Sequence, residues 1–200
     1  MQIDRILFPV YSLGPGKRMA LWTVGCKKRC RRCANPELRE FDSSKDISIS
    51  QLRRMIHTVD TDEIEGFTVS GGEPFCQLDA LNNCLDVMLE ITDDILIFTG
   101  YDIQELHDMH DGRIEGILQK AGVIVAGEYI DELNDNQTAL LASSNQQMLC
   151  RQEKLLKKYK EYMKQGRVIQ NVFYGNAMIS VGIHNTREGM HHDACAKMDS

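Results

Sequence analysis

Three cysteines within eight residues place the strongest constraint on this chain. Cys26, Cys30 and Cys33 follow the spacing C-x3-C-x2-C, and three thiolates on so short a loop must converge on one bound group. A [4Fe–4S] cluster has four irons, and each iron normally takes one thiolate. Three cysteines therefore leave one iron open, and an open iron can bind a substrate or a cofactor. The spacing predicts a reactive iron–sulfur site rather than a pure electron relay.

A structural zinc site and ordinary buried thiols are the alternatives to a cluster. A structural zinc site needs a fourth cysteine or histidine ligand in a paired spacing. The candidates are the C-terminal residues His191, His192 and Cys195, whose spacing fits such a pair poorly. The remaining cysteines form no second cluster pattern. Cys76 stands beside a glycine-rich turn, where it either lines a pocket or packs as a small buried thiol, and the second interpretation also suits Cys84.

The bulk properties favour a soluble intracellular domain. The 200 residues suffice for one domain with a full core, and no apolar run approaches the ~20 residues of a membrane span. The N-terminus lacks the apolar segment of a secretory signal, so the seven cysteines are better explained as reduced thiols or metal ligands than as disulfides. A net charge of −6 argues against a general nucleic-acid binder. We expect a cytoplasmic protein that binds neither membrane nor nucleic acid.

Strand-like and helix-like runs alternate along the chain. We expect strands at residues 3–8, 19–24, 64–70, 95–99 and 123–126, and helices at 49–57, 78–91, 103–109 and 114–120. Ser48 or Ser50 is expected to cap the first of these helices, and Asp102 the third. After a loop-rich stretch at 131–147, we expect a basic helix at 151–165 and a hairpin of residues 168–174 and 177–183. Repeated strand–helix units imply a mostly parallel sheet with helices outside it, and ligands gather at the C-terminal ends of such strands.

Three unusual loops follow predicted strands. They are the cysteine loop after residues 19–24, the segment from Ser70 to Pro74 after residues 64–70, and the segment from Thr99 to Tyr101 after residues 95–99. Because the C-terminal ends of parallel strands share one edge of a sheet, these loops are expected to lie together. Their convergence makes a site at that edge more credible than any one of them alone.

The cysteine spacing followed by a strand-end Gly-Gly-Glu resembles the radical S-adenosylmethionine (SAM) enzymes. In that family three cysteines hold a [4Fe–4S] cluster, and SAM chelates the open iron through its amine and carboxylate. The resemblance implies a cluster on Cys26, Cys30 and Cys33, and SAM-binding residues at Ser70, Gly71, Gly72, Glu73, Thr99, Tyr101 and Asn145. The Gly-Gly-Glu segment would contact the methionyl group. Strand-end packing is an equal alternative for Thr99 and Tyr101, and a turn cap is one for Asn145.

Further segments narrow the resemblance to one group of radical SAM enzymes. GPGKR, SGGEP, TGY and the pair AGEYIDELND and ASSNQ are similar to the small activating enzymes of anaerobic ribonucleotide reductase, over residues 1 to about 147. The resemblance implies reductive cleavage of SAM to a 5′-deoxyadenosyl radical, which installs a glycyl radical on a partner enzyme. A flavodoxin- or ferredoxin-type protein would supply the electron. Arg32, just before the last cysteine of the loop, stands where radical SAM enzymes often have an aromatic residue.

We therefore expect an α/β single domain whose repeated βα units form a partial, open TIM-like barrel. Residues 1–150 would be the radical SAM core domain. Residues 151–200 extend past the typical end of such proteins, and we expect this extension of basic helix, hairpin and tail to pack on the same domain.

Two other functions stay open on the sequence. One is a radical SAM enzyme that modifies a peptide or a small molecule, with the extension building its pocket. The other is a zinc- or cluster-bearing binding module that uses the basic cysteine loop. The basic residues of that loop also fit charge compensation for a cluster or docking of an acidic electron donor. The lysines of residues 151–167 fit either a solvated helix or a docking surface for the partner.

Overall fold

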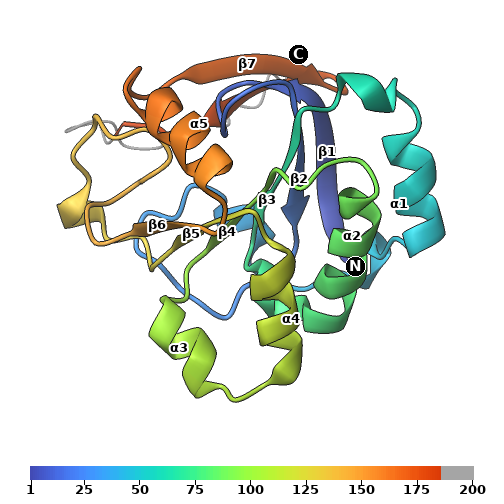
Figure 1. Ribbon diagram of the computed structural model, residues 1–200, viewed down its shortest axis with the longest axis horizontal. Coiled ribbons are helices and arrows are strands. Elements are labelled where there is room, and N and C mark those ends of the chain that lie inside the picture. Colours follow the sequence, from blue (N-terminus) through green and yellow to red (C-terminus); the bar gives the residue numbers. More distant parts are fainter. Residues whose placement is uncertain (186–200) are drawn as a thin grey trace, which may run out of the picture.

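Six strands form one sheet in the order in which they follow along the chain. The computed structural model describes residues 1–185. The strands are β1 (Ile3–Val10), β2 (Arg18–Thr23), β3 (Gly66–Gly71), β4 (Ile95–Thr99), β5 (Val123–Ala126) and β6 (Gln147–Cys150). β2 to β5 are parallel, and β1 and β6 are antiparallel edge strands (Figure 1). The expected α/β class with a parallel sheet is confirmed, whereas closure into a partial barrel stays a prediction.

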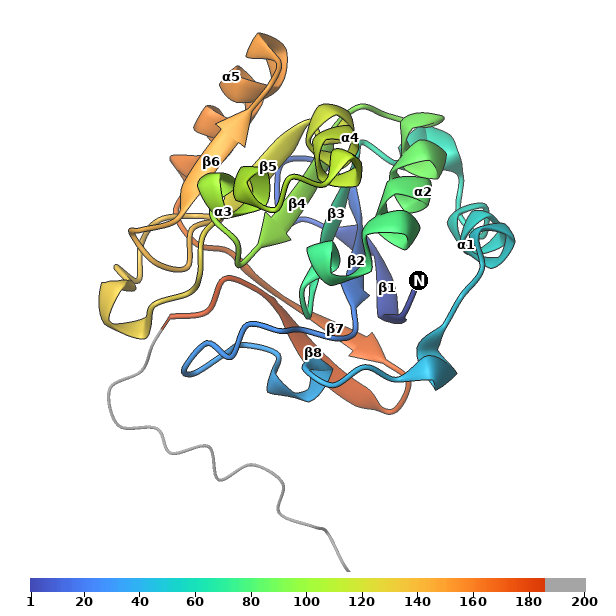
Figure 2. The same ribbon diagram turned by 90° about the horizontal axis from the view of Figure 1, so that it is seen from below.

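Four helices cover one face of this sheet. They are α1 (Ile49–Ile56), α2 (Leu78–Leu89), α3 (Ile103–Asp108) and α4 (Gly112–Lys120). Figure 2 shows them on one side of the strands. Successive residues of a strand point to opposite faces, so Met19 and Leu21 of β2 join the core under these helices, whereas Ala20 and Trp22 pack on the other face.

Side-chain caps fix where two of these helices begin. Ser48 and Gln51 form a reciprocal capping box at the start of α1, so Ser48 rather than Ser50 is the cap. Asp102 and Glu105 form a second capping box at the start of α3, as the expected cap at Asp102 requires. The helices therefore start where the sequence places them.

One strand is missing from the sequence-based prediction. β6 lies at the edge of the sheet, at the end of the stretch expected to be a loop, and it pairs antiparallel with β5. Its four residues are only partly buried and show no apolar–polar alternation. A strand this short is defined by pairing with its neighbour, which a local pattern does not reveal.

The opposite face of the sheet, here called the inner face, is covered by the C-terminal part of the chain. Helix α5 (Glu153–Met163) and the hairpin of β7 (Ile169–Tyr174) and β8 (Ala177–Gly182) lie there. Leu155 and Tyr159 of α5 pack against Leu96 and Val125, and Val181 of β8 packs with Trp22. The predicted boundary at residue 150 falls between β6 and α5, and the division into core and extension stays a prediction.

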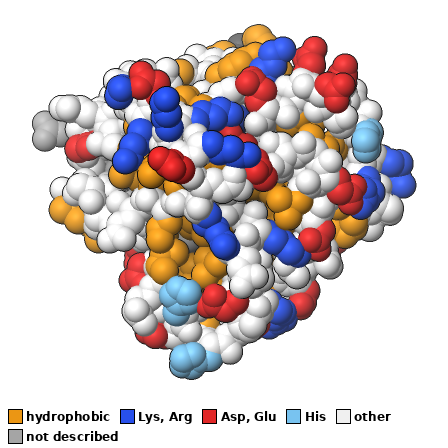
Figure 3. Space-filling view, in the orientation of Figure 1, with side chains coloured by type: hydrophobic (Ala, Val, Ile, Leu, Met, Phe, Trp, Pro, Cys, Tyr) orange, Lys and Arg blue, Asp and Glu red, His pale blue; other side chains and the backbone are white. Residues whose placement is uncertain are grey.

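Helix α5 is anchored on one side by ion pairs. Lys154 bonds Asp93 at 2.8 Å, and Lys158 bonds Asp94 at 2.8 Å. Figure 3 shows basic side chains over this helix with acidic ones among them. These two lysines therefore hold the helix to the body of the protein. Fewer lysines of the run are left for the docking surface that was one of its two interpretations.

A buried ionic network lies at the end of the sheet away from the cysteine loop. Arg18, the first residue of β2, is fully buried and bonds Asp94 at 3.0 Å and Thr68 at 2.7 Å. Asp94 Oδ1 also accepts a hydrogen bond from the hydroxyl of Tyr159, with an O–O distance of 2.7 Å. The network joins β2, β3 and the residue before β4 to α5, so it fixes the extension against the inner face. No helix within residues 1–185 is long and apolar enough to cross a membrane.

Candidate functional site

The loops after β2, β3 and β4 meet at one edge of the sheet. Glu73 of the loop after β3 donates its N–H to the carbonyl of Gly25, the residue before the first clustered cysteine, at 2.8 Å. Gly100 of the loop after β4 donates its N–H to the Glu73 carboxylate at 2.7 Å. The structure thus brings together the cysteine loop, the Gly-Gly-Glu turn and the segment from Thr99 to Tyr101.

Two glycines are required by the close approach of these loops. Gly71 has a φ of +113°, and a Cβ on it would lie 2.2 Å from the backbone nitrogen of Thr23. A Cβ on Gly72 would lie 2.5 Å from the carbonyl oxygen of Gly25. Any side chain would push the cysteine loop off the turn. The glycines therefore have a packing role, beside any contact with a cofactor.

The three clustered cysteines are free, half-buried thiols on one loop. Cys30 lies close enough to both Cys26 and Cys33 to interact with their charges. Burial first, and then the charge of Glu73, raise the pKa of Cys26 to about 11. Among residues 1–185, no three ligating side chains approach closely enough to share a single metal ion. Three soft sulfur donors on one loop fit the ligand set of an iron–sulfur cluster.

Two further thiols can now be located. Cys76 is half-buried beside the cysteine loop, where it interacts with Lys27, Tyr101 and the charge of Glu73. Cys84 is buried on the core-facing side of α2, as expected for a small apolar side chain. The alternative zinc ligands His191, His192 and Cys195 lie outside the described residues.

Glu73 links two strand ends from a buried position. The residue is 1% exposed. Its carboxylate accepts hydrogen bonds from Thr99 Oγ1 at 2.8 Å, Gly100 N–H at 2.7 Å and Phe75 N–H at 3.0 Å. Burial outweighs these bonds and raises the pKa of Glu73 to about 7. Thr99 is buried in the same contact. Both side chains position the loops, and this role was not foreseen from the sequence.

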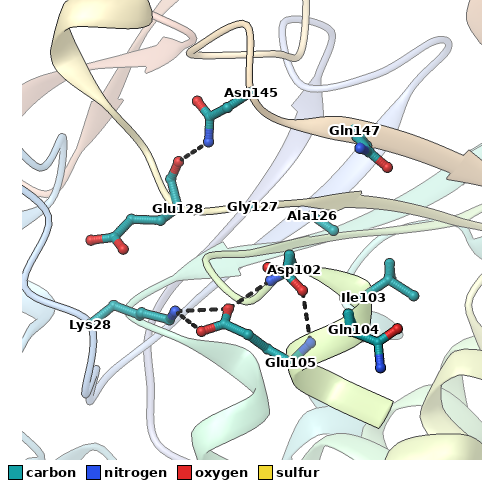
Figure 4. A pocket seen from close by; sticks show the side chains of 10 residues that line it. All are labelled: Lys28, Asp102, Ile103, Gln104, Glu105, Ala126, Gly127, Glu128, Asn145 and Gln147. Atoms are coloured by element: carbon teal, nitrogen blue, oxygen red, sulfur yellow. Dashed lines mark hydrogen bonds and ion pairs between the residues drawn. The ribbon is translucent and has the colours of Figure 1, made fainter. Parts of the chain in front are cut away.

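A cavity of about 500 Å³ opens beside these loops. Figure 4 shows its lining, which comes from the cysteine loop, the start of α3, the end of β5 and the start of β6: Lys28, Asp102, Ile103, Gln104, Glu105, Ala126, Gly127, Glu128, Asn145 and Gln147. Lys28 reaches across to bond both carboxylate oxygens of Glu105 at 2.9 Å. Its ammonium also lies 4.6 Å from the ring centre of Tyr101. The volume suits a small-molecule cofactor.

Asn145 is the predicted site residue that lines this cavity. Its Nδ2 donates to the carbonyl of Glu128 at 2.8 Å, while its Oδ1 is buried without a hydrogen-bond partner among the described residues. A buried acceptor without a partner costs free energy unless a ligand supplies a donor. Ser70 instead lines a smaller cavity on the inner face. Lys28, Glu105 and Glu128 were not selected from the sequence as site residues; only the cap at Asp102 pointed to this segment.

Comparison with known proteins agrees with this arrangement. The family model of a 4Fe–4S single cluster domain matches residues 12–149. An anaerobic ribonucleoside-triphosphate reductase-activating protein of Vibrio cholerae is 30% identical over 139 residues, which cover 66% of this chain and 87% of that protein. The proteins of the same description from Escherichia coli K12 and phage T4 are 27% and 25% identical, over 88% and 81% of their lengths. The chain belongs to this family of radical SAM activating enzymes. The match of the family model ends before α5 and the hairpin.

Four basic residues of the cysteine loop in this radical SAM enzyme are paired within the molecule. Lys28 pairs with Glu105, and the three arginines pair with carboxylates on other segments: Arg29 with Glu40, Arg31 with Glu132 and Arg32 with Asp131. Arg32, which replaces the aromatic residue, thus ties the loop to the segment after β5. Exposed pairs of this kind contribute little stability singly, but together they orient the loop over the cavity.

Burial of Glu73 predicts a pH dependence of stability in the cofactor-free enzyme. The pKa of Glu73 is about 7 in the folded state against an ordinary value of 4.5, so between these values the folded state holds a proton that the unfolded state has lost. The contribution to the free energy of unfolding is therefore greatest below pH 4.5 and falls by about 3 kcal/mol as the pH rises through 7. Urea unfolding at pH 5 and pH 8 measures it.

The matched variant is Glu73→Gln, which cannot ionise. Its stability deficit relative to the wild type is expected to be larger at pH 5 than at pH 8, because an amide NH₂ faces the Gly100 N–H at both values while only the wild type gains a proton. Glu161→Gln on the exposed side of α5 should show no such change. A deficit that does not depend on pH would contradict a raised pKa at Glu73.

Proposed function

We propose that this enzyme binds a [4Fe–4S] cluster on Cys26, Cys30 and Cys33, binds SAM beside it, and installs a glycyl radical on a partner resembling anaerobic ribonucleotide reductase. The observation that carries the proposal is the placement of three thiols on one loop, directly against the Gly-Gly-Glu turn and next to the 500 Å³ cavity. The activating function printed for the relatives supports the choice of partner.

When bound, the cluster and SAM would supply one-electron cleavage of the sulfonium, giving methionine and a 5′-deoxyadenosyl radical that takes a hydrogen atom from a glycine α-carbon to leave 5′-deoxyadenosine and a glycyl radical. The protein binds and orients these groups and keeps water from the radical. A flavodoxin- or ferredoxin-type donor would provide the electron. The open six-stranded sheet would serve as the partial barrel, and the reaction would take place in the cytoplasm.

The residues of the chain have separate tasks in this proposal. Gly71 and Gly72 let the cysteine loop lie against the turn, and Glu73 holds that turn to the end of β4 through Thr99. Backbone groups of the turn would meet the methionyl amine. Tyr101 and the free acceptor Oδ1 of Asn145 would meet the nucleoside part of SAM.

The proposal is tested on protein purified and reconstituted without oxygen. We expect about four irons and four sulfides per chain, and 5′-deoxyadenosine after addition of SAM and dithionite. With the anaerobic ribonucleotide reductase of the same source, a glycine-centred doublet should appear in the electron paramagnetic resonance spectrum. SAM cleavage without a glycine signal would favour a peptide- or small-molecule-modifying enzyme, and zinc without iron would favour a binding module.

A further inference from the structure

The C-terminal hairpin is a fixed part of the inner face. Gln170 of β7 donates its Nε2 to the carbonyl of Pro9 at 2.9 Å, and its Oε1 accepts from the N–H of Tyr11 at 2.8 Å. Val181 of β8 is 3% exposed in the cluster around Trp22. Figure 2 shows the hairpin on the side of the sheet opposite α1, α2 and α4. The hairpin lies outside residues 12–149, the part of the chain that the family model matches.

A second cavity lies between β8 and the strand ends of the candidate site. It has a volume of about 150 Å³ and is lined by Arg5, Leu13, Trp22, Ala34, Asn35, Ser70 and Phe98 together with residues 179–184. Six consecutive residues border it, so the backbone of β8, and not alternate side chains alone, faces the cavity. The volume is below the ~300–1,000 Å³ of typical small-molecule pockets. It suits a narrow stretch of polypeptide with little or no side chain.

The outer edge of β8 has backbone groups to offer. Within the described residues β8 pairs only with β7. Gly175 has a φ of +59°, and the two-residue turn makes Tyr174 and Ala177 the first pair of the hairpin. Hydrogen-bonded and non-hydrogen-bonded pairs alternate from there, so the backbone groups of Ser180 and Gly182 point away from β7. The Ser180 carbonyl lies 3.3 Å from His184 Nε2, so an added strand would bond the outward N–H of Ser180 and displace the His184 ring from the carbonyl. The edge can therefore take another extended strand.

Two further observations point to a polypeptide as the occupant. Arg5, whose guanidinium lies 5.3 Å from the ring centre of Trp22, has its Nε buried without a partner among residues 1–185. This N–H at the cavity can donate to a peptide carbonyl. The outer side of the hairpin also exposes large apolar side chains, with Phe173 84% and Met178 64% exposed. Adjacent exposed apolar residues mark surfaces that contact proteins.

We propose that β8 is a docking strand for the polypeptide substrate: its outer edge pairs with an extended segment of the partner, whose target glycine enters the 150 Å³ cavity beside Ser70 and the cysteine loop. This inference rests on the proposed function and names the part of the chain that recognises the partner. The small volume of the cavity favours a segment with little side chain. The extension thus contributes to substrate selection rather than to cofactor binding.

The test compares two substitutions at one position. Ser180→Pro removes an outward N–H without removing a bond to β7, whereas Ser180→Ala keeps that N–H. With the reductase of the same source, we expect the proline variant to lower the yield of glycyl radical about tenfold or more and the alanine variant to change it less than about twofold. Both should keep the iron content and the SAM cleavage seen without partner. Met55→Trp, on α1 across the sheet, is the control for an unrelated surface change.

A second measurement does not depend on activity. In hydrogen exchange on the cofactor-free protein, addition of the reductase should slow the amides of residues 178–184 and leave those of α1 unchanged. The proposal would be overturned by equal radical yields from the two Ser180 variants or by loss of SAM cleavage in the proline variant alone. It would also be overturned if the reductase left the amides of β8 unprotected while protecting other segments. Absence of both SAM cleavage and radical in the wild type would instead reject the proposed function.

Discussion

Replacement of Cys26, Cys30 or Cys33 by alanine is expected to abolish both the iron–sulfur chromophore and the cleavage of SAM. In the proposed site each thiolate would hold one iron of the cluster, so a variant with two thiolates would leave two irons without a protein ligand and the cluster would not be retained. We expect the iron content after anaerobic reconstitution to fall from about four per chain to well below one. Formation of 5′-deoxyadenosine should drop by at least about a thousandfold, because no electron can reach the sulfonium.

The control for this prediction is provided by other cysteines of the same chain. Cys84 is a buried residue of α2 and Cys150 lies at the end of β6, so Cys84→Ala and Cys150→Ala should keep the chromophore and the activity. Cys76→Ala is informative in a different way, because this thiol lies beside the loop; it should keep the iron. A full cluster in any of the three loop variants would contradict the assignment of the ligands.

Replacement of Arg18 by methionine is expected to lower the free energy of unfolding by about 3–5 kcal/mol, because it breaks a buried ion pair. The guanidinium is fully buried and serves Asp94 and Thr68, as well as the backbone carbonyls of Pro15 and Phe67. A methionine fills similar space but removes the guanidinium donors of Thr68 and of the two carbonyls, and it leaves Asp94 with Tyr159 and Lys158 as its side-chain donors. Urea unfolding of the cofactor-free protein measures the loss, and α5 should become more open to proteolysis because Asp94 also binds Tyr159.

The adjacent lysine gives a matched control. Lys17 pairs with Glu63 at 3.3 Å on the surface, and exposed pairs contribute about 0–1 kcal/mol. Lys17→Met should therefore change the free energy of unfolding far less than Arg18→Met, although the two positions are neighbours. Similar losses at both positions would show that the buried network does not carry the stability assigned to it.

Several features of the fold could be predicted because they depend on residues close together in the sequence. The caps at Ser48 and Asp102 and the two-residue hairpin turn all depend on residues a few positions apart. The same holds for the cysteine spacing. β6 was missed because its strand character comes from pairing with β5, and the role of α5 was missed because a basic, amphipathic run does not tell which surface it packs against.

The sequence by itself determined the kind of donor atoms and the order of the loops: three thiols, a Gly-Gly-Glu turn, and a strand alternation that brings them to one edge. Only the tertiary structure decided that Glu73 bonds Thr99, 26 residues away, that Lys28 bonds Glu105, 77 residues away, and that β8 closes the inner face. Ligand chemistry and helix caps depend on neighbouring residues. The pairing of distant charges and the covering of a sheet face depend on how the whole chain packs, which no local pattern encodes.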